Sequence, residues 1–223
     1  MTNDQLIDLS HPIVAGMTTY PGIPVPEIRP HLTREASRGH YAPGVEFRID
    51  VITMGGNTGT YVDSPAHRHA DGADLAALPL ERLVDVPAVR IDATAAGRAI
   101  DADVLRGHDL AGRAVLVQTG HDRHWGSDAY FRDNPFLTRD AVELLVAEGA
   151  AIVGIDTLNI DDTADLERPA HSLLLGAGIP IVEHMTNLGA VPHEGARFTA
   201  LPPPVVDFVT MPVRAVARVP VES

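Results

Sequence analysis

The sequence predicts an α/β fold, and the order of its apolar runs is the basis for this prediction. Residues 114–120, AVLVQTG, and 150–156, AAIVGID, are short apolar runs typical of buried strands, and the segment between them has a helical period. A second helical stretch at 171–178 leads into another apolar run, IPIVE, at 179–183. Strands that alternate with helices in this way form crossover units, in which the strands of one sheet run parallel.

Two segments in the first quarter of the chain have different patterns. Residues 21–30, PGIPVPEIRP, contain too many prolines for a helix or a central strand, so we expect an extended surface segment. In residues 45–53, VEFRIDVIT, apolar and charged side chains alternate. This period of two predicts a strand with one solvated face, which Gly55 and Gly56 bring to an end.

The second half of the chain has clearer boundaries. Thr138 is the expected N-cap of the first helix, and Gly149 stands just past its end. Residues 213–219, VRAVARV, predict a last strand after a proline-rich turn. Neither an internal repeat nor a low-complexity linker interrupts the chain, so the sequence predicts one domain over residues 1–223.

Composition excludes several classes of partner and chemistry. The chain has 223 residues and a formal net charge of -13, which repels a phosphate backbone, so nucleic acid is not expected as a partner. There is no cysteine, and any metal site must therefore use histidine, aspartate and glutamate. No export signal is evident, and no stretch approaches the roughly 18 apolar residues of a membrane span, so a cytoplasmic protein is expected.

Four polar residues stand near the ends of the predicted elements, where α/β sheets usually bind ligands. Asp63 and His67 lie in the segment 57–67, NTGTYVDSPAH. His171 opens the second helical stretch, and Glu183 ends the strand IPIVE. A carboxylate at the end of so apolar a strand is costly unless it is paired or bound to a metal.

Each of these residues also has a purely structural explanation. Asp63 suits an ordinary turn, and His67 suits a solvated loop. His171 has a place near a helix N-terminus, and Glu183 is a possible buried partner for an arginine such as Arg214. Only the combination of the four favours a functional site.

The segment 57–67 resembles a motif of the cyclase family of metal-dependent hydrolases, which includes bacterial kynurenine formamidase and isatin hydrolase. The family pattern is His-x-Gly-Thr-His-x-Asp-x-Pro-x-His. Similarity extends to IDLSHPI at 7–13, GIDTLNID at 154–161, PVRAVA at 212–217 and the spacing of twelve between His171 and Glu183. The resemblance implies a single-domain swivelling β/β/α fold with a mixed sheet.

The metal ligands that the resemblance implies are only partly present. In the family, histidines at the positions of Asn57 and Tyr61 bind a first metal together with Asp63 and Glu183, and both histidines are absent here. A second metal uses the positions of Asp63, His171 and Glu183, which are all kept. A site for one divalent ion is therefore expected, with zinc or manganese first, magnesium beside them, and a metal-free protein as the alternative.

The resemblance also implies roles for the surrounding residues. His67 stands at the family's acid/base position and would take a proton from water and return it to the leaving group. Tyr20 would line the flat face of a substrate. Tyr61 and Asn57, which replace the two histidines, are hypothesised to donate hydrogen bonds to a developing oxyanion.

Several functions remain as alternatives at this point. One is a hydrolase that uses one divalent metal to cleave a cyclic amide, a lactone or an N-acyl compound. Another is a catalytically silent relative that binds a small carboxylate or aromatic ligand, and a third is a biosynthetic cyclase or dehydratase. The resemblance further implies a homodimer or homotetramer that acts on a small molecule.

Overall fold

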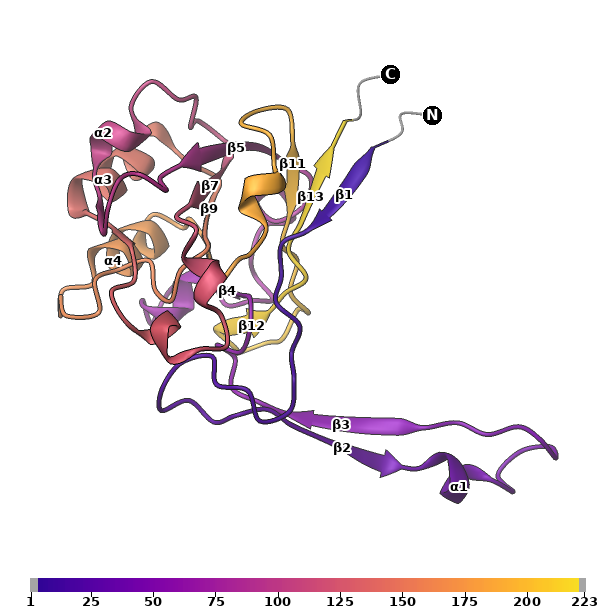
Figure 1. The fold of residues 1–223 in the computed structure, drawn as a ribbon. Coiled ribbons are helices and arrows are strands. Elements are labelled where there is room, and N and C mark those ends of the chain that lie inside the picture. The colour runs from indigo at the N-terminus through magenta and orange to yellow at the C-terminus, as the bar shows by residue number, and fades with distance from the viewer. Residues whose placement is uncertain (1–3, 221–223) are drawn as a thin grey trace.

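The computed structural model describes residues 4–220, and its largest feature is a curled, nine-stranded mixed sheet (Figure 1). The strands lie in the order β1-β13-β11-β5-β7-β9-β10-β4-β12. Their bounds are Gln5–Asp8 (β1), Val216–Val219 (β13), Arg197–Thr199 (β11), Val86–Asp92 (β5), Ala114–Gln118 (β7), Ile152–Ile155 (β9), Ile181–Glu183 (β10), Tyr61–Asp63 (β4) and Thr210–Pro212 (β12). The prediction of an α/β fold with a mixed sheet is confirmed.

The parallel centre of the sheet matches the crossover units expected from the sequence. Strands β5, β7, β9 and β10 run parallel, and the flanking strands pair antiparallel. Helix α3 (Arg139–Glu148) connects β7 to β9, with Thr138 as its N-cap and Gly149 in the left-handed conformation at its C-cap. Helix α4 (Pro169–Gly176) connects β9 to β10 and begins two residues before His171, which was expected to open it.

The two faces of the sheet bury separate apolar cores. One core includes Val115 and Val117 of β7 together with side chains of α3 and α4, which lie on the same side of the sheet (Figure 1). The other includes Leu116 of β7 and side chains from β11, β13 and β4. Alternate residues of β7 therefore face opposite cores, because successive side chains of a strand point to opposite sides. A fully apolar strand such as AVLVQ is the sequence signature of this double burial.

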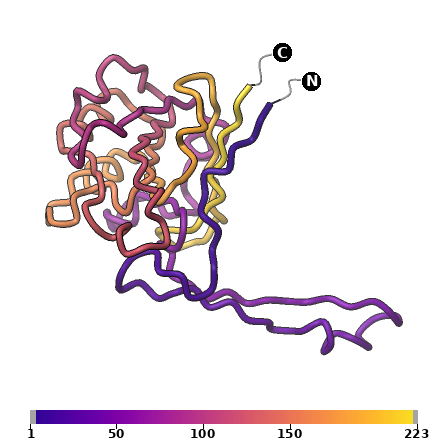
Figure 2. The backbone as a smooth tube through the Cα atoms, viewed as in Figure 1, coloured from indigo at the N-terminus to yellow at the C-terminus, as the bar shows by residue number. Residues whose placement is uncertain are grey.

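A two-stranded arm projects from this body (Figures 1 and 2). It is formed by β2 (Glu27–Leu32) and β3 (Ile49–Thr53), with the short helix α1 (Arg34–Ser37) near its tip. The proline-rich segment is therefore extended and lies at the surface, as expected. The strand predicted over 45–53 begins only at Ile49, so the first four residues of that prediction are wrong. Its apolar face is not buried either, because the arm extends beyond both cores and leaves Ile49 and Val45 exposed.

The remaining elements are short. A two-stranded parallel sheet joins β6 (Ala99–Ile100) to β8 (Phe136–Leu137), and α2 (Ala102–Leu105) contacts α3. Five 3-10 turns complete the described elements, at Pro65–His67, Leu80–Arg82, His121–His124, Asp128–Phe131 and Leu188–Ala190. Within residues 4–220, no helix has the length and apolar character required to cross a membrane.

Candidate active site

Three potential metal ligands from separate parts of the chain lie together inside the protein. Asp63 ends β4, Glu183 ends β10, and His171 belongs to the first turn of α4. One ligand atom from each residue lies within 4.8 Å of the others, and all three side chains are buried. These are the three residues that the sequence singles out as ligands of one ion.

Strand register explains why the two carboxylates meet. Strands β4 and β10 are antiparallel, with Asp63 opposite Ile181 and Tyr61 opposite Glu183. Residues two apart on a strand share a face, so Asp63 and Glu183 are diagonal neighbours on the face that Ile181 also occupies. Ile181 packs in the core beneath α4, and His171 therefore reaches the carboxylates from above this face.

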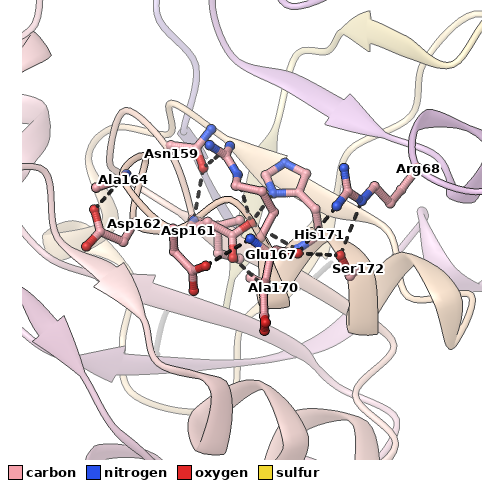
Figure 3. Close-up of polar contacts among 12 residues, drawn as sticks. Arg68, Asn159, Asp161, Asp162, Ala164, Glu167, Ala170, His171 and Ser172 are labelled. Atoms are coloured by element: carbon pink, nitrogen blue, oxygen red, sulfur yellow. Dashed lines mark hydrogen bonds and ion pairs between the residues drawn. The ribbon is translucent and has the colours of Figure 1, made fainter.

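Asp161 orients the imidazole of His171 (Figure 3). Its Oδ2 lies 2.6 Å from His171 Nδ1, and the same carboxylate accepts backbone N–H groups of Ala170 and His171 at 2.6 and 3.2 Å. A carboxylate can only accept here, so Nδ1 carries the proton and Nε2 is turned toward the other acids. Nε2 lies 3.8 Å from Asp63 Oδ2 and 3.9 Å from Glu183 Oε1.

The electrostatics of this cluster fit a bound cation. Burial lowers the pKa of His171, but the negative charges of Glu183, Asp161 and Asp63 outweigh burial and raise that pKa to about 8. Burial and the charge of Glu183 hold the pKa of Asp63 well above its usual range. Both oxygens of Asp63 are buried without a hydrogen-bond partner among the described residues. A divalent cation would satisfy these oxygens and remove the repulsion between the two carboxylates.

Glu183, in contrast, already has partners for both oxygens. Its Oε2 accepts the hydroxyl of Tyr61 at 2.5 Å, and its Oε1 accepts the backbone N–H of Ile160 at 2.7 Å. Burial and the nearby carboxylates of Glu183 and Asp63 raise the pKa of Tyr61 well above its usual range, so the phenol keeps its proton. The oxyanion hypothesis directs the hydroxyl of Tyr61 to the substrate. In the structure this hydroxyl donates its hydrogen bond to Glu183 instead.

His67 stands beside the three candidate ligands with a neutral ring. It ends the 3-10 turn Pro65–His67, and its Nε2 lies 4.0 Å from Asp63 Oδ1. Burial lowers the pKa of His67 to about 4, and the charges of His171, Arg68 and Arg168 act in the same direction. At neutral pH the ring is therefore a proton acceptor, and its side chain remains 33% exposed to an incoming molecule.

A cavity of about 370 Å³ opens over this cluster. Its walls are Tyr20, Ile23, Asn57, Tyr61, His67, Arg68, Asn159, Arg168, His171 and Glu183. The cavity thus includes Tyr20 and Asn57, which the sequence also points to. The oxygen Oδ1 of Asn57 accepts a hydrogen bond from Thr210 at 3.1 Å.

Sequence reasoning missed four polar residues of this site. Asp161, Asn159, Arg168 and Arg68 either line the cavity or hold a residue that does. Two of them fall in the segment 154–161 that carries the family resemblance, and that similarity was the available signal. Polar side chains directly after a buried strand were a second signal, since β9 ends at Ile155.

A sequence model of the Cyclase family, described as "Putative cyclase", matches residues 7–162. The chain belongs to the cyclase family. Among the relatives named kynurenine formamidase, the protein of Bacillus mycoides is 30% identical over 98% of this chain and 99% of its own, and that of Bordetella avium is 30% identical over 96% and 98%.

Solved structures agree with this assignment to the cyclase family. Isatin hydrolase A from Ralstonia solanacearum superimposes with a TM-score of 0.81 at 26% identity, covering 97% of this chain and 92% of that one. A predicted metal-dependent hydrolase from Bacillus stearothermophilus gives a TM-score of 0.76 at 28% identity, with 96% and 98% covered. The predictions of the family and of a hydrolase are confirmed.

Proposed function

We propose that this cyclase-family chain hydrolyses the amide bond of a small cyclic amide or N-acyl compound, with one divalent cation held by Asp63, His171 and Glu183. The observation that carries the proposal is the buried carboxylate of Asp63, which has no hydrogen-bond partner among the described residues and faces Nε2 of His171. Relatives named as metal-dependent hydrolases support the same class of reaction. A lactone or another ester would react by the same route.

The donor set suggests which cation to test first. Two carboxylates and one imidazole suit zinc or manganese, and magnesium prefers more oxygen ligands. A cation bound there would supply Lewis acidity toward the carbonyl and lower the pKa of water. Asp161 would keep the Nδ1 proton of His171 in place, so that Nε2 is free to act as the ligand.

His67 is the proposed general acid/base. Its ring is neutral at pH 7 because its pKa is about 4, and it borders the cavity next to Asp63. The ring takes a proton from the attacking water and then protonates the leaving nitrogen. Tyr20, which also lines the cavity, would contact the flat part of the substrate.

Tyr61 and Asn57 have separate tasks in this proposal. The hydroxyl of Tyr61 holds Oε2 of Glu183, so that Oε1 stays directed toward His171. The amide of Asn57 lines the cavity and is the remaining candidate for an oxyanion donor. Replacing Asn57 by Ala is then expected to lower kcat by about a hundredfold, as loss of one such donor does elsewhere.

Metal analysis tests the proposal directly. Protein purified without chelators should carry about one divalent ion, and the His171→Ala variant should lose it. His31→Ala is the matched control, because His31 is exposed on strand β2 of the arm, outside the cluster. Absence of metal under every loading condition would favour a metal-free mechanism or the alternative of a catalytically silent relative that binds a small ligand.

Activity assays complete the test. N-formylkynurenine and isatin are the first substrates to try, because relatives are named for reactions on these compounds. A metal-loaded protein that hydrolyses neither these nor a wider panel of amides and lactones would contradict the proposal.

The proposal includes a homodimer or homotetramer. Ile28, Ile49 and Ile52 of the arm are 44%, 46% and 46% exposed, and a two-stranded ribbon is marginal in water by itself. Contact with a second copy would cover these side chains. Light scattering on the purified chain measures the mass, and a monomer at micromolar concentration would contradict this part.

A further inference from the structure

Two arginines border the cavity on the side of His67, and the expected hydrolysis does not use either of them. Arg68 directly follows His67, and Arg168 directly precedes α4. Both belong to the wall of the cavity that contains Glu183 and His171. The chain has a formal net charge of -13, yet two of its arginines lie next to the candidate active site.

The partners of Arg68 among the described residues are neutral. Its Nε donates to Ser172 Oγ at 3.2 Å, and its Nη2 donates to the backbone carbonyl of Glu167 at 3.3 Å (Figure 3). Among residues 4–220 it forms no ion pair within 4.0 Å, although many of the other arginines do. The guanidinium is thus held in position while its charge stays available to a ligand.

The charge of Arg168 is only partly balanced. Its Nη2 donates to Asn159 Oδ1 at 2.8 Å, which is a neutral partner. Its Nε lies 3.5 Å from Asp161 Oδ2, but that carboxylate already binds the imidazole of His171 and two backbone N–H groups. Arg168 itself has a φ of 49°, a conformation that costs energy for a residue other than glycine.

We infer that the substrate of this enzyme carries a carboxylate, and that Arg68 and Arg168 bind it at the His67 end of the cavity. The inference rests on the proposed function, because it takes His67 as the group that protonates the leaving nitrogen. The fragment that leaves with this nitrogen lies on the His67 side, so the carboxylate belongs to it. The substrate class is then an N-acylated amino acid or aminobenzoate.

The chemistry of the two side chains supports a carboxylate over a neutral group. A guanidinium presents two parallel N–H donors that match the two oxygens of a carboxylate. A neutral ring would leave the charge of Arg68 without compensation.

Matched pairs of ligands test the inference. The probes are N-formylglycine, N-formyl-L-phenylalanine and N-acetylanthranilate, each compared with the corresponding primary amide, which has the same shape and no charge. We expect titration calorimetry to show that at least one acid binds about tenfold to a hundredfold more tightly than its amide, the range of a hydrogen bond to a charged group. Equal binding of acid and amide in all three pairs, or no binding of any acid, would overturn the inference.

Variants identify the residues responsible. Arg68→Gln and Arg168→Gln should each reduce the preference for the acid, and the double variant should abolish it. Arg68→Lys should keep part of it, because the charge remains. Arg106→Gln is the control, since Arg106 is exposed and pairs with Asp103 outside the cavity. A preference that survives in the double variant would also overturn the inference.

The test separates this inference from the proposed function. Binding is measured on both the metal-free and the metal-loaded protein, and metal content is measured independently. A chain that prefers the acids but binds no cation would disprove the metal-dependent mechanism and keep the anion site. A chain that binds a cation and hydrolyses amides without preferring acids would disprove only the anion site.

Discussion

His171 and His184 are both buried, lie close to Glu183, and behave in opposite ways. The ring of His171 faces three carboxylates, and its pKa is raised to about 8 in spite of burial. His184 lies among aromatic rings: its ring centroid is 5.3, 5.7 and 5.7 Å from those of Tyr61, Trp125 and Tyr130. Burial lowers the pKa of His184 to about 3.

The difference shows that burial alone does not decide what a histidine can do here, because neighbouring carboxylates can outweigh it. Nδ1 of His184 contacts the hydroxyl of Tyr130 at 2.9 Å, and its Nε2 has no hydrogen-bond partner among the described residues. Within residues 4–220 no carboxylate forms an ion pair with this ring, so it stays neutral and serves packing. His171 is also buried, but its neighbours are anionic, which suits a ligand for a cation.

The largest expected difference between the two histidines is in their effect on metal affinity. His171→Gln should weaken divalent binding about a hundredfold to a thousandfold, the share of one ligand in a site of several. His184→Gln should leave the affinity within about threefold, because that ring faces away from Asp63. Competition with a chromophoric chelator measures both affinities, and equal losses in the two variants would contradict the assignment.

A smaller effect is expected at Asp161, which gives His171 its orientation. Asp161→Asn keeps the shape but removes the negative charge from Nδ1. Metal affinity should fall about tenfold to a hundredfold, as is usual when the partner of a ligating histidine is changed. The pKa of His171 in the metal-free protein should also fall, and NMR titration of the ring measures it. An unchanged pKa would mean that Glu183 and Asp63 alone set it.

Acid should destabilise the protein through His184. Its pKa is about 6.5 in the unfolded chain and about 3 in the folded one, so between these values the unfolded state binds the extra proton. Stability is therefore intact above pH 6.5 and lost as the pH falls, by about 2 kcal/mol at pH 5 from this residue. His171 has no such effect in this range, because its folded pKa lies above 6.5 and its stabilising contribution is lost only as pH rises through about 8.

Urea unfolding at pH 7 and pH 5 checks this expectation. The loss of stability between the two values should be about 2 kcal/mol smaller in His184→Phe than in the original chain. Other groups titrate equally in both proteins and cancel in this difference. The same loss in both would show that His184 already takes up a proton in the folded state.

The smallest effect concerns Tyr61, whose hydroxyl binds Glu183 beside His171 and whose ring packs near His184. Tyr61→Phe removes the hydroxyl from Glu183 but keeps the ring beside His184. The metal-free protein should lose about 1 to 2 kcal/mol of stability, because Oε2 of a buried carboxylate is left without a donor. The pKa of His184 should not move. A change at His184 would show that the two surroundings are coupled.

Local patterns account for the parts of the fold that the sequence predicted well. The apolar runs of β7 and β9, the helix between them, and Gly149 at its end follow from burial and backbone conformation within about ten residues. The exposed arm was predicted less well, because the alternation in residues 45–53 indicates a strand without indicating whether any core lies beneath it.

The candidate site divides in the same way. The sequence pointed to Asp63, His171 and Glu183 through a family pattern and through a carboxylate that ends an apolar strand. It did not indicate Asp161 as the partner of His171, nor the hydrogen bond from Tyr61 to Glu183. Each of these contacts joins segments whose approach is not encoded by any local period.

The sequence by itself determined the crossover units and the caps of α3, since each of these depends on neighbouring residues along one strand or helix. Only the tertiary structure decided the pairing of β4 with β10 and the packing of α4 against the same face of the sheet. That pairing sets which charges surround each imidazole, and the electric field at a side chain depends on groups close in space, however far apart they are in the chain.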